Sequence, residues 1–227
     1  MMLLRPPGVY RPQSDTRLLA EALRGVGVPP GARVLDLGTG TGAVAMAAAR
    51  HGCEVVAVDV SARAVLATRL NARVRRLPIR VLRGDLFAPV PGEVFDVILA
   101  NPPYVPGADP AVARGRARAW EAGPGGRVLL DRICRAAPHH LTQSGTLLLV
   151  HSALNGVAAT LAALRRSGLR PSVAARHREP FGPVMRGRAA SLAARGLLRP
   201  GQEHEELVVV RADRVTASGD HERERAA

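Results

Sequence analysis

The sequence predicts an α/β fold in which a mostly parallel sheet of seven strands is covered by helices on both faces. Short apolar runs of strand length alternate along the chain with longer segments whose apolar residues recur at helical spacing. Glycine or proline stands at most of the junctions between them. Because parallel strands must be joined by a crossover, which is usually a helix, this alternation is typical of a parallel sheet wrapped by helices.

The expected elements follow one another in a regular order. A first helix begins at Ser14 or Asp15 and ends near Gly25 and Gly27. Strands are expected over residues 34–37, 54–58, 79–82, 94–100, 146–150, 170–175 and 206–210. Further helices are expected over residues 43–49, 61–74, 126–137 and 157–167, with an inserted loop and helix over 181–195. The stretch 105–124 lacks periodicity and is longer than ordinary connections, which indicates a functional loop.

The length of 227 residues and the hydrophobic content of 47% suit one domain, expected over residues 1–212. Residues 213–227 are small or charged, which predicts a disordered tail. The chain has no apolar run of membrane-spanning length and its first residues are too short for a secretory leader, so a cytoplasmic protein is expected. Cys53 and Cys134 lie far apart without metal-ligand spacing, so we expect buried thiols, no disulfide and no metal site.

The basic residues of this chain allow two interpretations. The formal net charge is +13, and all 32 basic residues are arginines. The excess could mark a surface for a polyanion, or it could reflect a GC-rich coding sequence and remain dispersed, solvated charge. Arg114, Arg116 and Arg118 lie in the long loop, where they could grip an acidic protein or a phosphate backbone, or simply be solvated.

A glycine-rich turn follows the first expected strand. Gly38, Gly40 and Gly42 form the sequence G-T-G-T-G, which allows a ligand to approach the backbone closely at a helix N-terminus. The spacing differs from the dinucleotide fingerprint, and Asp36 stands two residues before the first glycine, where it would repel a pyrophosphate. A carboxylate at this place can instead receive a ligand ammonium group, which disfavours a NAD site.

Acidic residues also end the next two expected strands. Asp59, at the tip of the second strand, is placed to bind two ribose hydroxyls. Asp85 and Leu86 end the third strand, where the carboxylate can accept from an adenine amino group and the leucine can pack on the ring. An amino acid, a ribose and an adenine in this order describe S-adenosylmethionine. With these residues the chain resembles the class I methyltransferases, which implies a Rossmann-like fold.

The fourth expected strand ends in N-P-P-Y, residues 101–104. In the methyltransferases that this chain resembles, the motif acts on a planar nitrogen of a base amine or a side-chain amide. The prolines hold the chain extended, so the Asn101 side chain and the Pro102 carbonyl can accept the two N–H groups of the target. Tyr104 can stack on the planar group, and Pro103 completes this expected catalytic set. Positioning and electrostatics could then carry most of the catalysis without a metal.

Two further stretches narrow the resemblance. V-Y-R-P-Q-S-D-T at 9–16 and A-W-E-A-G-P-G-G-R-V-L-L-D-R at 119–132 resemble the HemK-related glutamine methyltransferases, in the short branch without an N-terminal helical domain. The chain departs from that branch at Arg11 and Ser14, which replace residues that are usually acidic. It departs again over residues 181–200, which read as an insertion.

The resemblance, which spans about residues 9–170, implies a set of site residues. The expected cofactor-binding residues are Thr16, Asp36, Gly38, Gly40, Gly42, Asp59, Asp85, Leu86 and Asn101. The expected substrate-binding residues are Tyr10, Trp120 and Arg127. For Trp120 an alternative stays open, because its ring could pack against a glycine-lined turn instead of lining the channel.

The expected function is S-adenosylmethionine-dependent methylation of a protein glutamine side chain. The known targets of the family include the glutamine at the Gly-Gly-Gln tip of translation release factors, so a release factor is the expected partner, and some relatives also need a small partner subunit. Two other enzymatic interpretations remain: methylation of an exocyclic amine such as adenine N6 in RNA or DNA, and methylation of a small molecule. A non-enzymatic binding scaffold is disfavoured because every motif is intact.

Overall fold

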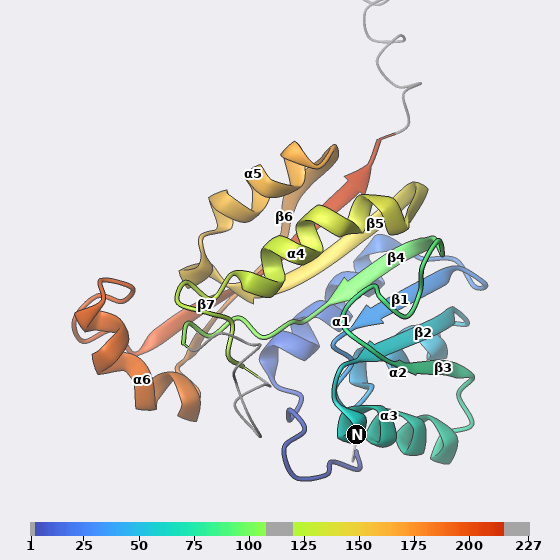
Figure 1. Ribbon diagram of the computed structural model, residues 1–227, viewed down its shortest axis with the longest axis horizontal. Coiled ribbons are helices and arrows are strands. Elements are labelled where there is room, and N and C mark those ends of the chain that lie inside the picture. Colours follow the sequence, from blue (N-terminus) through green and yellow to red (C-terminus); the bar gives the residue numbers. More distant parts are fainter. Residues whose placement is uncertain (1–2, 108–119, 216–227) are drawn as a thin grey trace, which may run out of the picture.

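A computed structural model of the chain describes residues 3–107 and 120–215, and these residues build one seven-stranded sheet (Figure 1). The strand order is β3-β2-β1-β4-β5-β7-β6, and all neighbouring strands are parallel except at β7, which runs antiparallel to both β5 and β6. This arrangement confirms the predicted α/β class. The strands are β1 Arg33–Leu37, β2 Glu54–Asp59, β3 Ile79–Arg83, β4 Phe95–Ala100, β5 Leu141–Ser152, β6 Leu169–Pro180 and β7 His204–Arg214.

Helices cover both faces of the sheet, as the alternating pattern predicted. The α-helices are α1 Ser14–Val26, α2 Ala43–Arg50, α3 Ala62–Val74, α4 Val128–Ala136, α5 Val157–Arg166 and α6 Pro183–Ala194. The short 3-10 turns η2 Ala137–His140 and η3 Ala153–Asn155 flank β5. The helices α1, α2 and α3 lie on one face, α4 and α5 lie on the other, and α6 lies beyond the ends of β6 and β7 (Figure 1).

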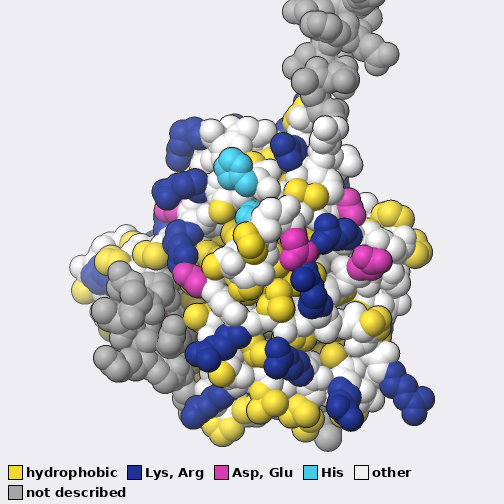
Figure 2. Space-filling view, turned by 45° about the vertical axis from the view of Figure 1, so that its right-hand side comes forward, with side chains coloured by type: hydrophobic (Ala, Val, Ile, Leu, Met, Phe, Trp, Pro, Cys, Tyr) yellow, Lys and Arg dark blue, Asp and Glu magenta, His cyan; other side chains and the backbone are white. Residues whose placement is uncertain are grey.

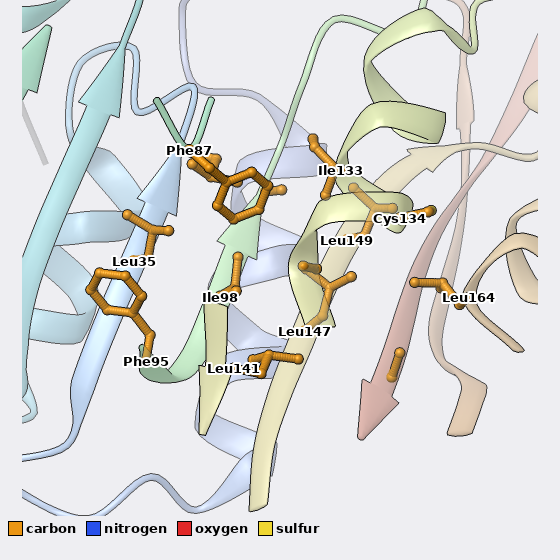
Figure 3. Close-up of a cluster of buried hydrophobic side chains, with 14 of the residues drawn as sticks. Leu35, Phe87, Phe95, Ile98, Ile133, Cys134, Leu141, Leu147, Leu149 and Leu164 are labelled. Carbon is orange, nitrogen blue, oxygen red and sulfur yellow. The ribbon is translucent and has the colours of Figure 1, made fainter. Parts of the chain in front are cut away.

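The central strands are buried on both faces, and this explains their nearly continuous apolar sequences. Successive side chains of β4 point to opposite faces. Ile98 joins the cluster under α4 and α5, which includes Ile133 and Leu164 (Figure 3). Leu99 joins the cluster on the other face, which includes Leu19 of α1. The strand that carries the N-P-P-Y motif at its end is therefore held rigidly between two cores.

Local sequence signals account for several element boundaries. The α3 helix begins after Ser61, whose hydroxyl caps it by accepting the N–H of Ala64. This start agrees with the predicted helix start at residue 61. The α1 helix ends at Gly27, which adopts a left-handed φ of 69°. Glycine is the residue best suited to such a helix end because it has no Cβ.

The three last strands are longer than predicted. The pair β6–β7 extends well beyond the expected ranges 170–175 and 206–210, in a register that runs from Leu169 opposite Arg214 to Pro180 opposite His204. Its outer part is rich in charged and exposed residues, because only one antiparallel partner stabilises it and one face meets solvent. This polar composition hid the extension from apolar-run analysis. The extended pair ends at α6.

Several predictions concern residues outside the described ranges. The strand β7 ends at Arg214, two residues past the expected domain end, and residues 216–227, with most of the expected disordered tail, are not described. The middle of the expected functional loop, with Arg114, Arg116 and Arg118, also lies outside them. Within the described part, both cysteines are buried and free, and no group of His, Cys, Asp and Glu has the arrangement of a metal site. No helix in the same ranges is long and apolar enough to cross a membrane.

Candidate active site

A cavity of about 670 Å³ lies at the carboxyl ends of the central strands. It lies where the strand order reverses, since the chain places β2 and β3 on one side of β1 and places β4 on the other. In open α/β sheets such a switch point is the general place for ligands. The volume falls within the range of ordinary ligand pockets.

Thirteen of the fifteen residues predicted for the site line this one cavity. They are Tyr10, Thr16, Asp36, Gly38, Gly40, Asp59, Asp85, Leu86, Asn101, Pro102, Pro103, Tyr104 and Trp120. The structure thus brings together the N-terminal segment before α1, four strand ends and the chain that precedes α4. The two remaining residues, Gly42 and Arg127, lie outside the cavity lining.

The glycine turn after β1 forms one wall of the cavity. Gly38 and Gly40 have left-handed φ values of 70° and 59°. A Cβ built on either glycine would meet no protein atom closer than 3.7 Å, so it would occupy cavity space. The backbone N–H groups of Gly40 and Ser61 donate to the two carboxylate oxygens of Asp59, at 3.0 and 2.8 Å. These bonds fix the carboxylate at the end of β2.

Asp36 is almost completely buried beneath this turn, with 3% of its surface exposed. Its Oδ2 atom accepts the Thr39 hydroxyl at 2.6 Å and the Ala45 N–H at 3.2 Å. Burial raises the pKa of this carboxyl to about 7, because desolvation outweighs the two hydrogen bonds and the nearby Asp59 charge raises the pKa further. A carboxyl with such a shifted pKa in a cavity is characteristic of a functional site.

The loop after β3 supplies the far end of the cavity. The Asp85 carboxylate forms an exposed ion pair with Arg132 of α4, with Nη–Oδ distances of 2.7 and 3.3 Å. Leu86 has a φ of 49°, in the left-handed region that non-glycine residues rarely adopt. Such a conformation costs roughly 1 kcal/mol and persists where the surroundings require it. It turns Leu86 into the lining of the cavity.

The N-P-P-Y segment leaves β4 on the opposite wall. Its last carbonyl, that of Tyr104, accepts the side-chain Nδ2–H of Asn155 at 2.7 Å. Asn155 lies in η3 with 3% of its surface exposed, and its amide also donates to the carbonyl of Gly126. Gly126 has a φ of 70°, and a Cβ there would overlap both the Asn155 amide and the Tyr104 carbonyl. Asn155 therefore fixes the end of the motif against a turn that only glycine fits.

One buried carboxylate connects the N-terminal segment to the motif. Asp15, 2% exposed, accepts the hydroxyl of Tyr10 at 2.8 Å and the hydroxyl of Tyr104 at 3.3 Å. Its other oxygen accepts the backbone N–H and the hydroxyl of Thr16 at 2.6 and 3.1 Å. Burial and the Asp15 charge raise the pKa of both tyrosines, so both phenols remain protonated donors. Gln13 completes the network by donating to the Tyr10 hydroxyl.

The two predicted residues outside the cavity have structural surroundings. A Cβ on Gly42 would approach the Thr68 side chain to 2.8 Å, so this glycine makes room for the packing of α2 against α3. Arg127 donates to the carbonyls of Asn155 and Gly156 and pairs with Asp131. It thereby joins α4 to η3, and it reaches the site only through Asn155.

Sequence reasoning missed Asp15 and Asn155. Asp15 belongs to the stretch at 9–16 on which the resemblance rests, but within that stretch only Thr16 and Tyr10 were given roles. Its carboxylate becomes informative when Tyr104, 89 positions away, is seen beside it. Asn155 carries no local signal, since it lies in a short turn that the sequence does not distinguish from other polar connections.

The fold and the cavity define a class I methyltransferase: a sheet of this order, a glycine turn above a buried acid, acidic strand ends and N-P-P-Y after β4. Comparison with known proteins agrees. Residues 2–118 match the family description "Methyltransferase small domain". The chain belongs to this family.

The relatives include glutamine methyltransferases. The chain is 35% identical over 181 residues to a Methanocaldococcus jannaschii protein to which N5-glutamine methyltransferase activity is assigned, covering 79% of this chain and 90% of the relative. It is 40% identical over 171 residues to the release factor glutamine methyltransferase of Salmonella typhimurium, covering 71% of this chain and 61% of the relative. The chain thus spans about three fifths of that bacterial relative. These matches confirm the resemblance to the HemK-related glutamine methyltransferases.

A solved structure supports the same placement. The structure of the E. cuniculi Mtq2–Trm112 complex, responsible for the methylation of the eRF1 translation termination factor, contains a chain that superposes with a TM-score of 0.65. The sequence identity is 25%, and the match covers 91% of this chain and 99% of that one. The T. thermophilus 16S rRNA N2 G1207 methyltransferase, which superposes with a TM-score of 0.60 at 23% identity over 92% of this chain and 46% of that one, was solved in complex with AdoMet, the cofactor that the sequence predicts here.

The residues present fit this cofactor. The space beside Gly38 and Gly40 admits a ligand at the backbone, and the cavity is large enough for a nucleoside with an amino acid chain. Three carboxylates, from Asp36, Asp59 and Asp85, lie along the same cavity in the order needed for an ammonium group, a ribose and an adenine amino group.

Proposed function

We propose that this protein is an S-adenosylmethionine-dependent N-methyltransferase whose acceptor is the side-chain amide of a glutamine in a translation release factor. The observation that carries the proposal is the placement of Asn101–Tyr104 in the same cavity as the glycine turn and Asp59. The names of the Salmonella and Methanocaldococcus relatives support the acceptor. A site that acts on release factors would work in the cytoplasm, beside the translation machinery.

The cofactor side of the cavity binds S-adenosylmethionine and orients it. S-adenosylmethionine, when bound, supplies a methyl group activated by its sulfonium. In our proposal Asp36 attracts the ammonium group, the fixed Asp59 carboxylate receives the ribose hydroxyls, and Asp85 and Leu86 border the adenine. Gly38 and Gly40 allow the backbone to come close. Thr16, held by Asp15, closes this side of the cavity.

The acceptor side has to prepare a poor nucleophile. The lone pair of an amide nitrogen is delocalised into its carbonyl, so the site must hold the NH2 group in line and favour localisation of that pair. The Asn101 side-chain oxygen and the Pro102 carbonyl can accept the two N–H groups, and the Tyr104 ring can stack on the amide plane. These groups are preorganised, because Asn155 fixes the Tyr104 carbonyl and Asp15 fixes its hydroxyl.

The direct test supplies methyl-labelled cofactor to the protein in parallel with purified release factors, with tRNA plus rRNA, and with genomic DNA. We expect label only on a release factor, at the glutamine of its Gly-Gly-Gln tip. Label on nucleic acid alone would contradict the glutamine proposal and would indicate a methyltransferase that acts on an exocyclic amine of RNA or DNA. If no macromolecule is labelled even when a small partner subunit is added, the proposed release-factor acceptor is wrong.

A pair of variants tests the role of the motif. Asn101→Ala should lower the transfer rate at saturating cofactor by about 100-fold or more, the usual effect of removing one preorganised polar group. Calorimetry measures the cofactor affinity separately, because Asn101 is also expected to contact the cofactor. Gln143→Ala, which removes an exposed amide from β5 away from the cavity, is the matched control and should transfer at the wild-type rate. Unchanged transfer by the Asn101 variant would refute the positioning mechanism.

A further inference from the structure

The helix α6, which lies in the connection between β6 and β7, packs against the acceptor side of the cavity. Its buried residues Met185 and Leu192 form a small separate core with Phe181, Leu198 and Val105. Tyr104 and Trp120, two cavity residues, pack against this core from the other side. An element that is remote in sequence therefore supports the residues that face the acceptor.

The chain that leaves the motif is paired with the chain that returns to α4. The N–H of Val105 donates to the carbonyl of Trp120 at 2.9 Å, and the N–H of Ala122 donates to the carbonyl of Val105 at 3.1 Å. The N–H of Gly107 donates to Gly123 at 2.9 Å. We call this paired segment, residues 105–107 with 120–123, the neck. Its geometry sets where Tyr104 and Trp120 stand.

Arg188 of α6 holds the neck through three contacts. Both of its terminal nitrogens reach the Glu121 carboxylate, and Nη1 also donates to the Pro106 carbonyl at 3.0 Å. Glu121 is 4% exposed, so its charge depends on a close cationic partner. A Cβ on Gly107 would overlap both the Glu121 carboxylate and the Arg188 guanidinium, so glycine is required where the pair crosses the neck.

We propose that α6 is the element that shapes acceptor binding, and that Arg188 is the positioning residue through which it fixes the neck. The inference deepens the proposed function, on which its kinetic test rests. The sequence predicts that residues 181–200, which include α6, are an insertion relative to the short glutamine methyltransferase branch. The helix packs with Tyr104 and Trp120 and not with the glycine turn. It should therefore govern which acceptor is accepted and leave cofactor binding alone.

The guanidinium group is suited to this task because of its shape. A planar fork can serve a carboxylate and a neighbouring carbonyl together, whereas a lysine ammonium can hold the charge without the fork. Removing Arg188 alone would take a cation away from a buried carboxylate, an electrostatic cost that is separate from the loss of the fork. The informative variant is therefore the double substitution Arg188→Met with Glu121→Gln, which removes both charges of the pair together.

The experiment measures acceptor kinetics, cofactor affinity and amide exchange on the full chain. For the double variant we expect the specificity constant for the release factor to fall about 100-fold, the loss that an ångström-scale displacement can cause, with cofactor affinity unchanged. The amides of Val105, Gly107 and Ala122 should exchange faster. The single variant Arg188→Lys should be more active than the double variant, because the lysine keeps the positive charge beside Glu121. Arg186→Ala, an exposed arginine of the same helix, is the control and should transfer at the wild-type rate.

Three outcomes would overturn the inference: wild-type transfer by the double variant, an equal loss of cofactor affinity, or unchanged amide exchange in the neck. The exchange measurement needs no acceptor. It therefore decides whether Arg188 fixes the neck even where release-factor methylation itself is absent, so failure of the proposed function and failure of this inference are distinguishable.

Discussion

At the scale of single residues, we expect the buried Asp36 carboxyl to couple cofactor binding to pH. Its pKa is raised to about 7 by burial, so the ionised fraction grows from about 0.1 at pH 6 to about 0.9 at pH 8. Only the ionised form attracts an ammonium group. We therefore expect the cofactor dissociation constant to fall about tenfold between pH 6 and pH 8, measured by calorimetry. Asp36→Asn should bind more weakly at pH 8 and lose this dependence, and a pH-independent wild type would contradict the assignment.

The raised pKa of Asp36 also makes the stability of the folded protein depend on pH. Because the folded-state pKa of Asp36 lies above its ordinary value of 3.8, the folded protein holds this proton more tightly than the unfolded chain does. The stabilisation is present below about pH 4 and is lost as the pH rises through about 7. The ionised carboxylate that binds the ligand thus costs stability, which is the usual relation between a functional site and its fold.

Asp15 is expected to act through the two tyrosines that it orients. Asp15→Asn keeps one acceptor oxygen but removes the charge that holds the hydroxyls of Tyr10 and Tyr104. Hydrogen bonds to charged groups contribute about 1.5–3 kcal/mol, so the specificity constant for the acceptor should fall roughly tenfold or more. On a Tyr104→Phe background the same substitution should add little, in a double-mutant cycle. Additive losses would mean that Asp15 does not work through Tyr104.

The residues that the sequence could reveal share one property. Gly38, Asp59 and Asn101 each follow a recognisable apolar strand, and the parallel arrangement brings all strand ends to one edge. Asp15 and Asn155 act on Tyr104 across 89 and 51 positions, so their roles depend on packing that no local pattern encodes. Residues that line the cavity at the strand ends were thus more predictable than the residues that orient them.

At the scale of elements, the turn before α4 is a sensitive support of the motif. Gly126→Ala would place a Cβ against the Asn155 amide and the Tyr104 carbonyl at a φ of 70°. A side chain is disfavoured at that φ, and the overlap adds to the strain, so we expect a loss of more than about 1 kcal/mol in unfolding free energy together with reduced transfer. The neighbouring Gly125→Ala, whose Cβ would meet no atom within 4 Å, is the matched control.

Chemical denaturation with a transfer assay separates the two effects of this substitution. If both alanine variants lose stability and activity equally, the position of Gly126 beside Tyr104 has no special importance. A loss confined to Gly126→Ala would show that the turn before α4 supports the motif through Asn155.

The order and type of the elements were predictable as far as β5 because strand-length apolar runs alternate with helical spacing, except that a loop without a helix joins β3 to β4. The extent of β6 was not, because residues 176–179 are arginine, histidine, arginine and glutamate in an outer strand with solvent on one face. The contacts of α6 were also inaccessible, since its sequence predicts a helix but gives no clear buried face. Tertiary partners, not propensity, determine these features.

At the scale of the whole molecule, two helical layers share one sheet, and the site lies where its strand order reverses. This arrangement holds the strand ends rigid while the connections around them vary. In the proposed function, cofactor binding draws on β1, β2 and β3, whereas the acceptor side draws on β4, η3 and the distant α6. Acceptor choice can therefore change through the second group without disturbing the first.

The net charge of +13 belongs to this scale as well, and we expect it to cause weak binding of nucleic acid without preference or methyl transfer. Basic side chains are spread among acidic and hydrophobic ones on the face seen in Figure 2. Some arginines are already engaged, such as Arg33 and Arg80, which share Glu93.

Binding of tRNA, rRNA and unrelated single strands should be equally weak and should fall with salt. A protein that neutralises six phosphates loses about 10³-fold in affinity between 50 and 200 mM salt, so a much shallower slope would indicate dispersed charge. A strong preference for one RNA, with methyl incorporation, would contradict this expectation and favour a nucleic-acid acceptor.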